Sequence, residues 1–124
     1  MVVHVTVQVE DEDGTREAAD SLIEAFERGF VPDARGVEPA KGGPAPDGAR
    51  SGELAVLGGL IVTTLSQPES VGAVLRYIAD RIGRRQGSVE IDIDGRKLLI
   101  ENATKEQVET LIDAYLRKVF DQDS

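Results

Sequence analysis

Apolar and polar residues alternate along the first ten positions, which read VVHVTVQVE after the initial methionine. Successive side chains of a β-strand point to opposite faces, so this alternation predicts a strand with one buried face. The buried face holds Val3, Val5, Val7 and Val9. His4 falls on the opposite, polar face together with Thr6.

Three later segments space their apolar residues three and four apart, as the buried stripe of an amphipathic helix does. The first is predicted over residues 16–28 with Thr15 or Asp13 as its N-cap. The other two begin at capping-box sequences, residues 66–69 and 104–107. The predicted stripes are Ala19, Leu22, Ile23 and Phe26; Val71, Val74, Leu75, Ile78 and Ile82; and Val108, Leu111, Ile112, Tyr115 and Val119.

The clearest local signal is the segment SVEIDIDGRKLLIE at residues 88–101. Asp94-Gly95 between alternating residues is a strong signal for a two-residue β-hairpin turn. Folding about that turn opposes Ile91 with Leu98, Val89 with Ile100, and Asp92 with Lys97. The apolar pairs share one face and the charged pair lies on the other, so register and pattern agree.

The longest apolar run, Leu54 to Leu65, contains no charged residue. A membrane-spanning helix needs about 20 apolar residues, so this run is too short to cross a bilayer. We expect a helix that is buried on several sides. Small residues recur at Ala55, Gly59 and Thr63, with Gly58 alongside. They would let another element approach closely, either the domain's own sheet or a second copy of the chain.

The remaining segments complete the predicted architecture of a single domain over residues 1–124. A short second strand is expected at residues 35–38, limited by Pro39. Residues 39–50 form a Gly/Pro-rich stretch that we expect to be an exposed loop, and residues 121–124 a polar tail. The predicted order is β-α-β-α-α-β-β-α. It implies an α+β fold, in which helices pack on a small mixed four-stranded sheet.

Charge and composition exclude several partners. The chain has 14 basic and 23 acidic residues, a formal net charge of −9, and no cysteine. An acidic surface opposes binding to nucleic acid or to anionic membranes. No basic leader precedes an apolar segment, which favours a cytoplasmic protein. The one basic cluster is Arg81, Arg84 and Arg85, with Arg76 one turn earlier. It complements a helix C-terminus, or forms a contact for nucleic acid or for an acidic protein partner.

No catalytic constellation is visible, and the sequence predicts neither a cofactor nor a resident metal. His4 is the only histidine, and no serine lies in a nucleophile-elbow sequence. The hairpin residues do fall on calcium-loop positions. The acids Glu90, Asp92, Asp94 and Glu101 occupy positions 1, 3, 5 and 12, and Gly95 occupies position 6. Alternation with Val89, Ile91 and Ile93 instead favours the exposed face of a strand. A calcium or small-ligand sensor remains the alternative function.

Four blocks of this chain resemble a known family: VVHVTVQVE, GELAVLGGLIVTTL, SVGAVLRYIADRI and SVEIDIDGRKLLIENATKEQVETLIDAYL. Their order and hydrophobic texture are similar to the effector-associated constant component domains of bacterial conflict systems. The resemblance covers most of residues 2–119 and omits the loop. It implies a non-enzymatic adaptor in antiviral defence, which acts beside effectors such as trypsin-like or caspase-like proteases.

The functional hypothesis is therefore an adaptor that binds a protein effector and further copies of itself. Its candidate interaction residues are the small residues Ala55, Gly58, Gly59 and Thr63 and the basic residues Arg81, Arg84 and Arg85. The family implies no catalytic residues that can be assigned to positions of this chain.

Overall fold

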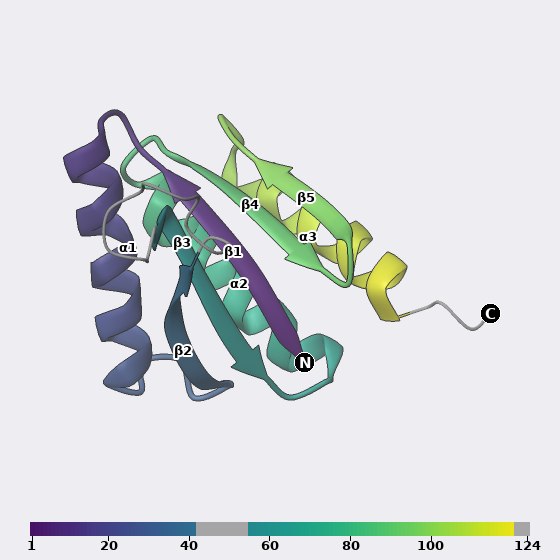
Figure 1. Cartoon of the computed structure of the whole chain (residues 1–124). Helices are drawn as coiled ribbons and strands as arrows, with labels where there is room; N and C mark the ends of the chain where they lie inside the picture. Colours follow the sequence, from purple (N-terminus) through teal and green to yellow (C-terminus); the bar gives the residue numbers. More distant parts are fainter. Residues whose placement is uncertain (42–54, 121–124) are drawn as a thin grey trace.

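The computed structural model describes residues 1–41 and 55–120 (Figure 1). The elements along the chain are β1 (Val2–Gln8), α1 (Glu12–Glu27), β2 (Ala34–Lys41), β3 (Ala55–Thr64), α2 (Pro68–Gly83), β4 (Ser88–Ile93), β5 (Arg96–Ile100) and α3 (Lys105–Phe120). The fold is α+β, as predicted, but several features of the predicted sheet are wrong. The described sheet has five strands instead of four, and the segment predicted as an apolar helix is the strand β3.

All described strand pairs are antiparallel, in the order β2-β3-β1-β4-β5, so the sheet is not mixed. The first six elements run β-α-β-β-α-β, and β1 lies between β3 and β4. This is the ferredoxin-like arrangement. The hairpin strand β5 and the helix α3 extend it at one side, as Figure 1 shows on the right.

The strand β3 was mistaken for a helix because its outward positions carry no charge. Leu60 and Val62 point into the core and are fully buried. The alternate positions hold Gly59, Ile61 and Thr63, which lack the polar signature of a solvent-facing strand row. Periodicity alone cannot separate a short apolar strand from a buried helix. The β-branched run IVTT at residues 61–64 was the available signal for a strand.

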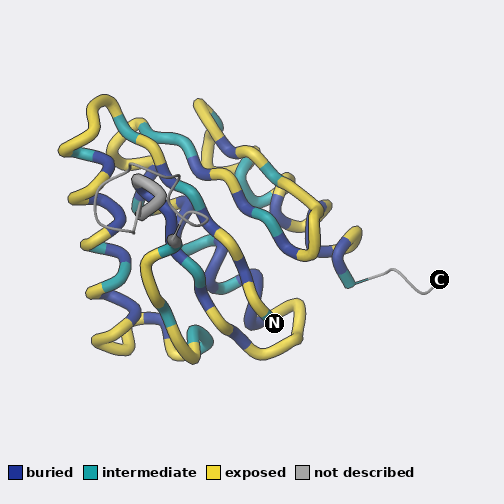
Figure 2. Tube along the Cα trace, in the orientation of Figure 1, coloured by how far each residue is buried: buried dark blue, intermediate teal, exposed yellow. Residues whose placement is uncertain are grey.

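The helices cover one face of the sheet, and that face holds the core. In β1 the predicted alternation is confirmed: Val3, Val5 and Val7 are buried, whereas Val2 and His4 are exposed. The same alternation recurs in β4 and is visible as alternating colours in Figure 2. In the view of Figure 1 the strands lie in front of α2 and α3. The opposite sheet face carries no helix of the described chain, and it is called the open face below.

The helix starts differ from prediction at two of three positions. Helix α1 begins at Glu12, because the Asp11 carboxylate accepts a hydrogen bond from the Gly14 amide at 2.6 Å and caps the helix. Helix α2 has Gln67 as N-cap without a side-chain hydrogen bond, so the predicted capping box at residues 66–69 does not form. The second box is confirmed: Thr104 and Gln107 exchange two bonds of 2.9 and 3.1 Å.

The hairpin register is confirmed in full, with Ile91 opposite Leu98, Val89 opposite Ile100 and Asp92 opposite Lys97. Strand β2 is longer than predicted and continues through Pro39 to Lys41. It can do so because β2 is an edge strand, where a proline without an N–H is tolerated. The predicted loop at 39–50 therefore loses its first three residues to β2. The rest of that loop and the tail at 121–124 lie outside the described residues.

Among the described residues, no helix combines the length and apolar character needed to cross a membrane.

Candidate functional site

The predicted small-residue cluster is divided by the strand geometry. Gly58 has φ +75°, and a Cβ on it would collide with the Val7 carbonyl oxygen and lie 2.7 Å from the Thr15 methyl carbon. Gly59 and Thr63 instead pair with Thr6 and Val2 of β1. Ala55 pairs with Lys41 at the other end of β3. These residues do not form one helical face. Close packing at Gly58 is against β1 and α1 of the same chain.

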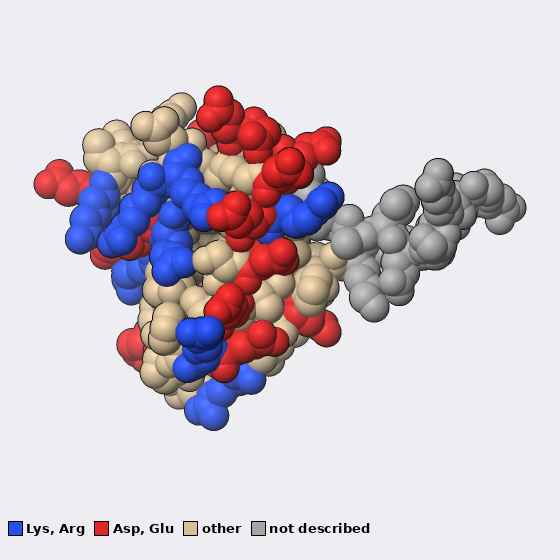
Figure 3. Space-filling view, turned by 90° about the vertical axis from the view of Figure 1, so that its left-hand side faces the viewer, with Lys and Arg blue, Asp and Glu red and all other residues tan. Residues whose placement is uncertain are grey.

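The basic cluster at the end of α2 is occupied by contacts within the molecule. Arg81 donates a 2.8 Å hydrogen bond to the Ser21 hydroxyl of α1 and lies 5.7 Å from the centre of the Tyr77 ring. Arg84 pairs with Asp80, and Arg85 reaches Glu17 at 3.5 Å. Figure 3 shows basic side chains gathered on this side of the molecule, with acidic side chains directly beside them. Arg81 and Arg85 therefore join α1 to α2, whereas the Arg84 pair stays at the end of α2.

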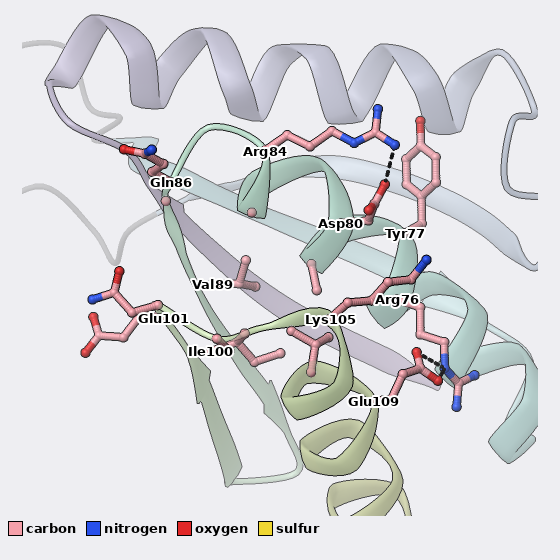
Figure 4. Close-up of a pocket in the computed structure, with 16 residues that line it drawn as sticks. Arg76, Tyr77, Asp80, Arg84, Gln86, Val89, Ile100, Glu101, Lys105 and Glu109 are labelled. Carbon is pink, nitrogen blue, oxygen red and sulfur yellow. Dashed lines mark hydrogen bonds and ion pairs between the residues drawn. The ribbon is translucent and has the colours of Figure 1, made fainter.

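A groove of about 1010 Å³ lies between α2, α3 and the β4–β5 hairpin (Figure 4). The buried side chains of Val89 and Ile100 belong to its lining. Its charged lining residues are three basic ones, Arg76, Arg84 and Lys105, and three acidic ones, Asp80, Glu101 and Glu109. This balance gives the groove no dominant sign of charge with which to select a ligand.

Arg76 joins the two helices that border the groove. Its Nε lies 3.1 Å from both carboxylate oxygens of Glu109, and its Nη2 lies 2.9 Å from Asp113 Oδ1. Glu109 and Asp113 are one turn apart on α3. They would repel each other without the guanidinium between them.

Replacing Arg76 with Met is expected to lower the free energy of unfolding by about 0.4–2 kcal/mol, since it removes two exposed ion pairs that contribute about 0.2–1 kcal/mol each. The Arg76 side chain is 39% exposed, so added salt should shrink the difference. Urea unfolding at low and high salt measures both effects. Arg84→Met, which breaks only the pair within α2, is the matched control and should cost less. A loss at Arg76 that is insensitive to salt would contradict an ion-pair origin.

The acidic hairpin does not assemble a metal centre. Asp92 Oδ1 accepts a 2.9 Å hydrogen bond from the Gly95 amide and so stabilises the turn. Glu90 and Asp92 lie on the open face, whereas Val89, Ile91 and Ile93, which alternate with them, are buried. Residues 1–41 and 55–120 contain no group of three or more acidic or histidine side chains placed to hold an ion. The calcium alternative therefore gains no support.

His4 lies at the middle of the open face. Its cross-strand partners are Ile61 on β3 and Asp92 on β4. Together with Glu90 it borders a shallow hollow of about 380 Å³ on that face. A general base requires a positioned proton-transfer partner, and no hydrogen bond of His4 with a described residue provides one.

The open face has an uncharged centre. Its middle rows contain Gly59, Ile61 and Thr63 of β3 beside Val2 and Thr6 of β1, paired across the strands. Val2 is 48% exposed, and Ile61 is partly exposed. Acidic residues flank this centre on both sides: Glu90 and Asp92 lie on β4, and Glu38 of β2 stands opposite Ile61. This arrangement is suited to contact with another protein surface, since charged residues are depleted at the centre of such interfaces.

Leu99 was missed as a candidate residue. It is 54% exposed, lies on β5 and stands opposite Glu90 on the open face. The signal was present in the sequence: three consecutive apolar residues, Leu98 to Ile100, cannot all point to one side of a strand. Leu111 was predicted to be buried but is 37% exposed. Leu116, which was not among the predicted core residues, is buried instead.

Fold and geometry thus define an α+β sandwich with an uncovered sheet face and no assembled catalytic centre among the described residues. No protein-family profile and no curated protein matches this chain. The solved structures include a de novo designed protein with a ferredoxin fold, determined by solution NMR. It is 12% identical, with 83% of this chain and 84% of that chain covered, at a TM-score of 0.36. That likeness carries no functional argument.

Proposed function

We propose that this chain is a non-enzymatic adaptor of a bacterial conflict system. In this role it binds a protein effector, such as a trypsin-like or caspase-like protease, and also associates with itself. The observation that carries the docking role is the open sheet face, where the uncharged residues Ile61 and Thr63 of β3 are accessible beside Val2 of β1. The resemblance of the four sequence blocks supports the choice of defence and of an effector as partner.

Two further features support a docking role. An antiparallel sheet commonly leaves one face to water, but such a face normally alternates apolar residues inward with polar residues outward. Here the outward rows of β3 carry no charge, and Val2 is half exposed beside them. The net charge of −9 would also steer the domain toward a basic surface of an effector, more strongly at low salt.

Co-expression with a trypsin-like or caspase-like protease effector tests the proposal. The two proteins should elute as one complex. Thr63→Arg on the open face should abolish the complex, because an unpaired charge would be desolvated at the interface. Thr110→Arg, the same change on an exposed position of α3, is the matched control and should leave the complex intact. Absence of a complex, or equal loss in both variants, would count against docking at the open face.

A further inference from the structure

We propose that two copies of this chain associate through β5, which pairs with β5 of the second copy as an antiparallel strand. The two sheets would then form one continuous sheet. This inference rests on the self-association part of the proposed function and assigns it a surface. That surface is different from the small-residue segment of β3, whose Gly58 is already packed against its own chain.

The two edges of the sheet differ in regularity. Edge strand β2 contains Pro39, and its pairing with β3 has two register shifts. Proline lacks a donor and shifts break the row of backbone groups, so β2 is a poor template for another strand. Edge strand β5 pairs with β4 in an unbroken register from Arg96 to Ile100. It is therefore the edge to which a strand can add.

The turn determines which backbone groups of β5 are available. Asp94 and Gly95 have φ of 53° and 84°, as a two-residue hairpin turn of type I′ requires. Ile93 and Arg96, which flank this turn, are then the first hydrogen-bonded residue pair of the hairpin. Hydrogen-bonded and non-hydrogen-bonded pairs alternate along an antiparallel ladder, so Lys97 and Leu99 belong to non-hydrogen-bonded pairs. Their backbone N–H and C=O groups therefore point away from β4. These are the groups that a second strand would bind.

The side chains of β5 make the edge self-complementary about Leu99. A twofold axis at Leu99 places the two Leu99 side chains opposite each other on the open face, where each is 54% exposed in the single chain. The same axis places Lys97 opposite Glu101 of the second copy, and the reciprocal pair forms on the other side. Opposite charges across strands stabilise pairing, and like charges destabilise it. The sequence is thus basic at the start of β5 and acidic just after its end.

Both charges are available for this contact. Within the described part of the chain, neither Lys97 nor Glu101 has an ion-pair partner. Both residues are exposed. Leu111 of α3 adds a second exposed apolar residue, beside the segment that follows β5. An edge of one short strand buries less than the roughly 1,600 Å² of a standard interface, so the dimer should be weak and reversible.

Charge reversal tests the pairing. Sedimentation at protein concentrations up to about 1 mM should show a reversible dimer of the unaltered chain, because a Kd in the range of about 0.1–1 mM is expected for a small interface. Lys97→Glu and Glu101→Lys should each weaken the dimer about tenfold, since each creates two like-charge contacts. The double variant Lys97→Glu/Glu101→Lys should restore the dimer to within about threefold of the unaltered chain, because both opposite-charge pairs re-form.

Matched controls lie on the other edge of the sheet. Arg35→Glu and Glu38→Lys on β2 change the net charge by the same amounts and should leave the dimer unchanged. Amide hydrogen exchange gives a second readout: protection at Lys97 and Leu99 should rise with protein concentration. A monomer at every concentration, a double variant that fails to recover, or an equal effect of the β2 controls would overturn the proposal.

The outcomes also separate this inference from the proposed function. Protection of Lys97 and Leu99 only when an effector is added would mean that β5 takes a strand of the effector. That result would overturn the dimer but keep the adaptor role. A dimer with the predicted charge dependence that binds no effector would keep this inference and remove the adaptor role.

Discussion

Gly58→Ala is expected to destabilise the fold by about 2–5 kcal/mol. An L-residue with positive φ costs about 1–2 kcal/mol, and forcing an extra methyl group into a packed site costs about 1–3 kcal/mol more. At Gly58 both terms apply, because its φ is +75° and its Cβ would meet the Val7 carbonyl and the Thr15 side chain. Urea unfolding of the variant measures the loss against a total stability of about 5–15 kcal/mol.

Two other glycines separate the conformational cost from the steric one. Gly29 has φ +82° with no atom within 4 Å of the added Cβ, so Gly29→Ala should cost only the conformational term. Gly83 has open space and no positive φ, so Gly83→Ala in the last turn of α2 should be neutral or slightly stabilising. A Gly58→Ala variant no less stable than Gly29→Ala would show that β3 does not pack closely on β1 and α1.

Tyr115→Phe is expected to lower the free energy of unfolding by about 1–3 kcal/mol, the cost of leaving a buried polar group without its partner. The Tyr115 hydroxyl accepts a 3.1 Å hydrogen bond from the Ile93 amide and donates a 2.6 Å bond to the Arg96 carbonyl. It thereby attaches α3 to the turn end of the β4–β5 hairpin. Strand β5 of this hairpin is the proposed dimer edge. The variant should also increase amide exchange at Ile93.

The same hydroxyl should make stability depend on alkaline pH. Burial raises the pKa of Tyr115 from 10.0 to about 12, although the hydrogen bond from Ile93 opposes that rise. The folded-state pKa lies above the unfolded one, so this contribution is complete below pH 10 and is lost as the pH rises to about 12.

Unfolding measured between pH 9 and 12 should therefore show a steeper loss of stability in the unaltered chain than in Tyr115→Phe. Tyr77→Phe is the matched control, because the Tyr77 hydroxyl makes only a long 3.4 Å contact with Arg81. Identical pH profiles for the unaltered chain and Tyr115→Phe would contradict a buried, hydrogen-bonded hydroxyl.

The elements with local signals were predicted well. The hairpin register followed from the Asp94-Gly95 turn, and the start of α3 followed from the Thr104–Gln107 capping box. Both signals arise between residues close in sequence, where backbone geometry and side-chain chemistry act directly. The predicted start of α1 was wrong, because several acidic residues of the preceding turn could serve as its N-cap. Only the hydrogen bond from Gly14 identifies Asp11.

The candidate site was predicted less well, for a different reason. Whether residues 54–65 form a helix or a strand depends on neighbours far along the chain, β1 on one side and β2 on the other. The spacing of Gly58, Gly59 and Thr63 was therefore interpreted as one face of a helix, whereas these residues lie on a strand. The exposure of Leu99 likewise depends on β5 being the last strand of the sheet, a property of the sheet order.

The sequence by itself determined the α+β class, the buried faces of β1, α2 and β4, and the hairpin with its charged outer pair, because each depends on contacts within a few residues or on simple periodicity. Only the tertiary structure decided that the apolar segment is a central strand, that Arg81 and Arg85 join α1 to α2, and that β5 is a regular edge strand of the described sheet. Those features depend on which distant segments pair. Hydrogen bonding between remote strands produces no characteristic residue spacing in the sequence.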